Sequence, residues 1–122
     1  MTNHNYCGPF ALSIILGKSY LSCENILKEN SMGDVPVSGV WVGSMINALR
    51  SQGLKLNMLK ADGSYTLSSF KGIKGLYLCE VKGHYVVIRN GIMYDTIHPN
   101  GCDPTRHKVL RAYEVIQDHG IL

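Results

Sequence analysis

The chain has 122 residues, which leaves room for one hydrophobic core, so we expect a single domain over residues 1–122. Hydrophobic residues make up 45% of the sequence and charged residues 17%, which argues against bulk disorder. The net charge of +3 comes from scattered basic residues, which give no clear indication of nucleic-acid binding. No apolar run approaches the roughly 18 residues that span a bilayer and no secretory signal is visible, so we expect a cytoplasmic protein without a membrane partner.

The first half of the chain carries the periodicity of helices. Apolar spacing predicts helices over residues 8–16, 22–30 and 40–52. Pro9 suits a first helical turn, where the N–H that proline lacks would have no partner. Gly17 and Gly53 are predicted to end the first and third helices, and Ser22 is predicted as the N-cap of the second.

The second half of the chain has the pattern of strands. A short helical turn is predicted over residues 66–71, and strands are predicted over residues 55–60, 76–81, 83–89, 92–96 and 108–115. Asn90-Gly91 lies between two apolar runs, which is the strongest short-range signal for a β-hairpin. Helices followed by an antiparallel sheet make an α+β fold.

Cys7 is the first candidate for chemistry because it directly precedes a predicted helix. The free N–H groups and the positive end of the dipole at a helix N-terminus stabilise a thiolate, which is the reactive form of cysteine. The same N–H groups can hold an oxyanion. The alternative is that Cys7 is a small buried apolar residue, as most free cysteines are.

The other three cysteines are weaker candidates. Cys23 also lies near a predicted helix start, Cys79 is in the middle of a predicted strand, and Cys102 is in a polar loop. No C-x-x-C pair and no zinc-ligand spacing is present, so we expect neither a metal site nor a cofactor.

The predicted hairpin places a histidine and an aspartate on one face. A two-residue turn at Asn90-Gly91 pairs Val86 with Asp95, which makes His84 and Asp95 diagonal neighbours with Cα atoms about 7–8 Å apart or less. A carboxylate at that distance orients an imidazole ring and stabilises its protonated form. Two alternatives stay open: the two residues have no shared role, or His98 in the following loop is the base.

Two short blocks of the sequence resemble the papain-like cysteine peptidases. The first, residues 5–12, reads NYCGPFAL, and the second, residues 83–96, reads GHYVVIRNGIMYDT. Within this superfamily they are most similar to the compact bacteriocin-processing type and to small papain-like proteins encoded by bacteriophages. The resemblance follows the whole chain in order, and it is specific in these two blocks.

The resemblance implies a papain-like fold in which N-terminal helices pack on a C-terminal antiparallel sheet. It implies that Cys7 is the nucleophile, that His84 is the general base and then the acid, and that Asp95 orients the histidine. The implied activity is that of a cysteine hydrolase, a protease or isopeptidase, which cleaves a peptide or protein substrate through a thioester without a cofactor.

The chain departs from the family at the oxyanion hole. Met1 stands where the family usually has a glutamine, and Asn3 and Asn5 are the amide side chains expected to replace it. Because losing one such donor typically costs about 10²–10³ in rate, a second function stays open. It is a catalytically weak or inactive papain-like binding module, such as a phage virion component or an inhibitor of a host protein. A third possible function is that of an N-terminal nucleophile amidohydrolase, in which cleavage before Cys7 exposes the nucleophile. The sequence does not indicate the oligomeric state.

Overall fold

Three helices precede a five-stranded sheet in the computed structural model, which describes residues 7–30, 42–59 and 65–117. The helices are α1 (Cys7–Leu16), α2 (Tyr20–Glu29) and α3 (Val42–Ser51), and a short 3-10 helix, η1, covers Leu67–Phe70. The strands are β1 (Leu54–Met58), β2 (Leu76–Val81), β3 (His84–Arg89), β4 (Ile92–Tyr94) and β5 (Arg111–Gln117). This confirms the predicted α+β fold with N-terminal helices and a C-terminal antiparallel sheet.

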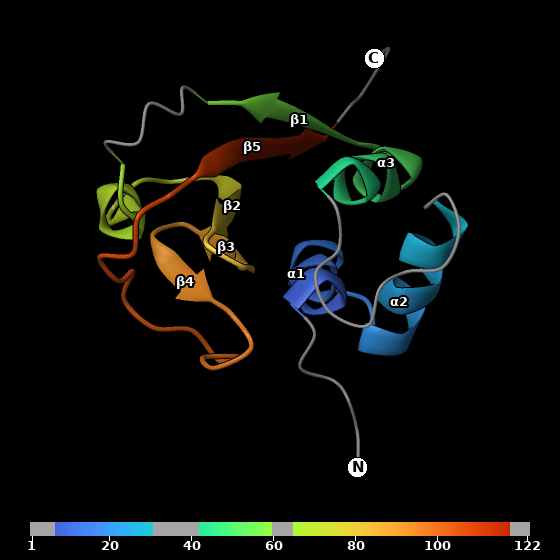
Figure 1. Cartoon of the computed structure of the whole chain (residues 1–122), viewed down its shortest axis with the longest axis horizontal. Coiled ribbons are helices and arrows are strands. Elements are labelled where there is room, and N and C mark those ends of the chain that lie inside the picture. Colours follow the sequence, from blue (N-terminus) through green and yellow to red (C-terminus); the bar gives the residue numbers. More distant parts are fainter. Residues whose placement is uncertain (1–6, 31–41, 60–64, 118–122) are drawn as a thin grey trace.

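The strands form one antiparallel sheet in the order β1-β5-β2-β3-β4, and the three long helices cover one of its faces (Figure 1). Side chains along β3 alternate between two cores, as the pleat requires. Tyr85 and Val87 belong to the core under the helices, whereas Val86 and Ile88 belong to a second core on the opposite face, shared with η1. None of the described helices has the length and apolar character needed to cross a bilayer.

Helix α1 packs along β3, and the two elements run in the same direction. Near the C-terminal ends of both elements, Arg89 Nη2 donates a hydrogen bond to the carbonyl oxygen of Ile14 at 2.6 Å. At the other end, Cys7 packs against the helix-side core to which Tyr85 belongs. These two contacts bring the first residue of α1 to the end of the sheet where β3 begins.

The start of α2 differs from the prediction. Ser19 is the N-cap, and its Oγ accepts a hydrogen bond from the N–H of Ser22 at 3.1 Å, so the prediction of Ser22 as the cap was wrong. Both serines have the side chain that capping needs, and the helix begins after the earlier one, with Cys23 and Leu27 buried in the core. Residues 40 and 41 of the third predicted helix lie outside the described residues.

The hairpin between β3 and β4 has the predicted register, with Arg89 paired to Ile92 across a turn at Asn90-Gly91. Both turn residues have positive φ, 50° at Asn90 and 83° at Gly91, as a type I′ turn requires. A Cβ added at Gly91 would lie 2.8 Å from the backbone nitrogen of Gly72. This position therefore needs glycine for its conformation and for close packing.

We expect Gly91→Ala to lower the free energy of unfolding by about 2–4 kcal/mol, because it adds a backbone clash to the cost of a positive φ. The matched control is Gly83→Ala, since Gly83 has φ 69° and nothing within 4 Å of an added Cβ. That variant should lose only the conformational part, about 1–2 kcal/mol. Urea unfolding followed by circular dichroism measures both, and equal losses would contradict the close approach to Gly72.

Candidate active site

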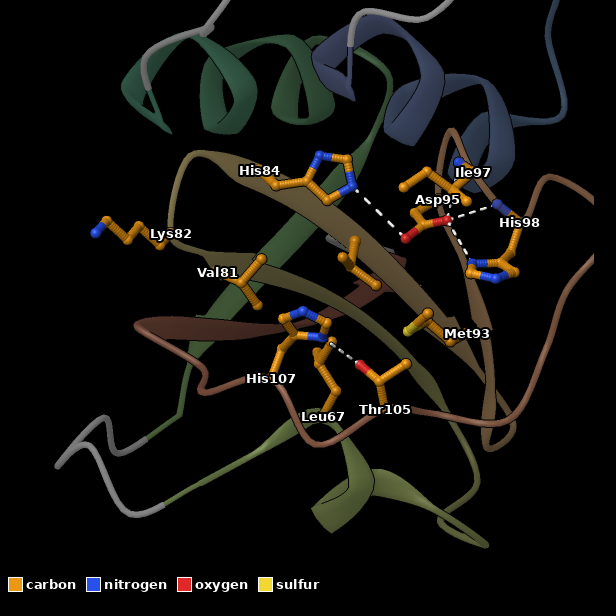
Figure 2. A pocket seen from close by; sticks show the side chains of 11 residues that line it. Leu67, Val81, Lys82, His84, Met93, Asp95, Ile97, His98, Thr105 and His107 are labelled. Carbon is orange, nitrogen blue, oxygen red and sulfur yellow. Dashed lines mark hydrogen bonds and ion pairs between the residues drawn. The ribbon is translucent and has the colours of Figure 1, made fainter.

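His84 and Asp95 meet at the end of the sheet where β3 begins. A tight turn after β2 makes His84 the first residue of β3, while Asp95 directly follows β4. His84 Nε2 lies 3.6 Å from Asp95 Oδ2, and Figure 2 shows the two side chains pointing toward each other. The expected proximity of the two residues is therefore present. The distance is slightly longer than a hydrogen bond.

Asp95 is held firmly by the loop that follows it. Asp95 is only 6% exposed, and its Oδ1 accepts hydrogen bonds from the backbone N–H groups of Ile97 at 3.0 Å and His98 at 2.7 Å. The ring Nδ1 of His98 lies 3.2 Å from the same oxygen. These contacts use Oδ1 and leave Oδ2 facing His84, so the carboxylate has one defined orientation.

The contact of His98 with Asp95 was missed by the sequence analysis, which considered His98 only as a replacement for His84. The histidine side chain is 43% exposed, yet its ring nitrogen contacts the buried carboxylate. The available signal was the spacing: an aspartate often accepts hydrogen bonds from the N–H groups two and three residues later. That turn folds the loop back and brings the His98 ring to Asp95.

Cys7 is the first residue of α1 and is half-buried. It contacts the helix-side core beside Tyr85, the residue after His84. Burial raises the pKa of Tyr85, and the charge of Glu80 raises it further. The structure therefore brings His84 and Asp95 together, whereas Cys7 packs on the helix-covered face of the sheet.

Cys7 and His84 approach that end from different faces. Tyr85 belongs to the core under the helices, whereas His84 lines the pocket on the opposite face with Val86 and Met93. Between these two described residues no hydrogen bond is formed. Catalytic hydrogen bonds are often long in a free enzyme and shorten when substrate binds. In Figure 2 the second ring nitrogen of His84 points away from Asp95, toward the side on which the helices lie.

A pocket of about 190 Å³ opens beside His84 and Asp95, between the far face of the sheet and the loop after β4 (Figure 2). His107, which the sequence gave no role, contributes to its wall, and its Nδ1 lies 2.7 Å from Thr105 Oγ1. The remaining lining is largely apolar and comes from Leu67, Val81, Val86, Met93 and Ile97.

The other cysteines have environments that oppose ionisation. Cys23 and Cys79 are fully buried, and burial raises the pKa of both thiols, that of Cys79 to about 12. Burial also raises the pKa of the partly buried Cys102, with a further increase from the charges of Asp95 and Asp103. These three thiols are therefore poorer nucleophiles near neutral pH.

The oxyanion-hole candidates Asn3 and Asn5 lie outside the described residues. Among the residues that are described, no group of three or more histidine, cysteine, aspartate or glutamate side chains is arranged to hold a metal ion. His84 and His98 instead approach different oxygens of Asp95. The arrangement suits proton transfer and nucleophilic attack by sulfur.

Comparisons with protein-family models, with curated proteins and with solved structures found no match.

Proposed function

We propose that the protein is a papain-like cysteine hydrolase that cleaves a peptide or isopeptide bond with Cys7, His84 and Asp95. The observation that carries this proposal is the His84–Asp95 pair, with 3.6 Å between Nε2 and Oδ2, at the start of β3, the strand that packs against the helix beginning with Cys7. A nucleophile, a base and a group that orients the base are the components of covalent acyl transfer.

The reaction begins when His84 takes the proton of the Cys7 thiol and the sulfur attacks the carbonyl carbon of the substrate. N–H groups at the start of α1 stabilise the resulting oxyanion, because the first N–H groups of a helix have no partner within it. The carbon–nitrogen bond breaks as His84 gives its proton to the leaving amine, and a thioester remains on Cys7. Water then attacks the thioester with His84 as base, which releases the acid and restores the thiol.

Asp95 serves this cycle by fixing the histidine. Its Oδ2 faces Nε2 of His84, so the second ring nitrogen, Nδ1, is the one that exchanges protons with sulfur and amine. The negative charge of the carboxylate also stabilises the ring during the steps in which it is protonated. Because backbone N–H groups hold Oδ1, the carboxylate does not turn away from the ring between steps.

Alkylation of the folded protein tests whether Cys7 is activated. With limiting iodoacetamide at neutral pH, we expect Cys7 to be modified at least about tenfold faster than Cys102, because the tip of a helix favours the thiolate. Cys102 is the matched control since both thiols are partly buried. Cys23 and Cys79 should react only after unfolding. Peptide mass spectrometry follows each site, and equal rates at Cys7 and Cys102 would overturn the proposal.

A second candidate function is a binding module on the same fold, with catalysis weak or lost. It is favoured by the missing hydrogen bond between the described residues Cys7 and His84. Such a module would act as a phage virion component or as an inhibitor of a host protein, in the host cytoplasm or in the virion. A pull-down with Cys7→Ala separates the two functions: a binding module keeps its partner and its effect, whereas a hydrolase traps substrate and loses turnover.

A further inference from the structure

We propose that the pocket beside His84 and Asp95 binds an apolar side chain of the substrate, on the amine side of the bond that is cleaved. This inference rests on the proposed hydrolase function and adds a substrate class to it: peptides with a residue such as leucine directly after the scissile bond. Three properties of the pocket support it, namely its size, its position relative to the imidazole and its charge.

The size of the pocket fits one side chain. Its volume of about 190 Å³ is below the roughly 300–1,000 Å³ of sites that enclose a drug-sized molecule. At about 30 Å³ per molecule in the liquid, it would hold about six waters. The floor consists of buried apolar groups, among them Leu67, Val86 and Met93, which gain from the removal of water by another apolar group.

The position of the pocket selects the amine side of the substrate. His84 forms part of the wall, so a bound side chain contacts the same ring that protonates the leaving nitrogen. The carbonyl carbon, in contrast, is attacked from the tip of α1, and α1 packs on the other face of the sheet. A group in the pocket therefore belongs to the part of the substrate that leaves as the amine.

The charges around the pocket disfavour a cationic side chain. Asp95 is the only carboxylate in the described lining, and its two oxygens face backbone N–H groups, His98 and His84. The other ionisable groups there are the histidines and Lys82, and in Figure 2 the Lys82 side chain extends away from the remaining lining. A buried lysine or arginine of the substrate would have no available counter-charge.

Methionine methyl groups provide a direct test of binding in the full chain. Met93 lines the pocket, Met45 lies in the core under the helices, and Met58 is exposed on β1. With ¹³C-methyl-methionine labelling, leucine methylamide should shift the Met93 signal and leave those of Met45 and Met58 unchanged. Glycine methylamide, which lacks the side chain, should bind about tenfold more weakly or worse, and lysine methylamide should resemble it.

The outcomes separate failure of the pocket from failure of the hydrolase. If leucine methylamide does not shift Met93, or binds no better than glycine methylamide, the pocket proposal is overturned. If Met93 shifts but no peptide of a leucine-containing series is cleaved, the proposed hydrolase fails and the pocket remains a ligand site. If peptides are cleaved equally well with glycine or leucine after the scissile bond, the hydrolase stands and the pocket proposal falls.

A size-switch variant gives a readout that a loss of stability would not produce. Met93→Ala enlarges the pocket, so the preferred residue after the scissile bond should change from leucine to phenylalanine or tryptophan by about tenfold in relative kcat/KM. Met45→Ala is the matched control, because it removes the same atoms from an equally buried site in the other core. An unchanged preference in Met93→Ala would also overturn the proposal.

Discussion

Replacing Cys7 with alanine is expected to lower kcat by about 10⁵–10⁶, to the level that substrate positioning alone sustains. The sulfur is the atom that forms the thioester, and no other described thiol is placed to replace it. Cys23 and Cys79 are fully buried. Cys102 lies in the loop region beyond β4, where its backbone forms an isolated β-bridge with Met93. Single-turnover hydrolysis of a peptide or ester substrate provides the measurement.

The matched control for this variant is Cys102→Ala, which removes a partly buried thiol outside the proposed triad. It should keep kcat within about threefold of the original protein, since the Cys102 thiol takes no part in the proposed reaction. Activity that survives in Cys7→Ala within tenfold would show that the reaction, if it occurs, uses another nucleophile.

Asp95→Asn is expected to lower kcat by about 10⁴ while the fold is kept. The asparagine oxygen can accept the same two hydrogen bonds from Ile97 and His98, so the loop retains its turn. The amide NH₂ then faces His84 Nε2 and, as a donor, forces this nitrogen to be an acceptor. The proton moves to Nδ1, and that nitrogen can no longer take the proton of the thiol.

A comparison of activity with thermal unfolding checks this explanation. The control is Asp103→Asn, which removes the same charge from an exposed residue in the following loop and should change neither property noticeably. A large loss of stability in Asp95→Asn, with activity lost in proportion, would assign Asp95 to loop structure and not to the histidine. Full activity would remove it from the proposed mechanism.

The sequence predicted the parts of the structure that depend on local rules. Asn90-Gly91 specifies a type I′ turn, which fixes the register of β3 and β4 and with it the shared face of His84 and Asp95. The helical pattern in the first half of the chain and the strand pattern in the second half were sufficient to predict the α+β fold. Both inferences use residues close together in sequence.

Features that depend on contacts between distant residues could not be predicted. Ser19 and Ser22 both have the side chain of an N-cap, so local sequence did not distinguish between them as the start of α2. The pocket exists because residues 105–107 return to the far face of the sheet, so the role of His107 in its wall had no sequence signal. The position of Cys7 on the helix-covered face of the sheet likewise follows from how α1 packs on β3.

The hydrogen bond between Arg89 and Ile14 anchors α1 at the end farthest from its cysteine. Ile14 follows Cys7 by seven positions in the helix, which corresponds to about 10 Å along the helix axis. A tilt of about ten degrees around this anchor displaces the sulfur by about 2 Å, which is comparable to the difference between contact and no contact with an imidazole. In the proposed reaction, the position of the sulfur would therefore depend on a guanidinium at the opposite end of the helix as well as on the groups that surround the thiol.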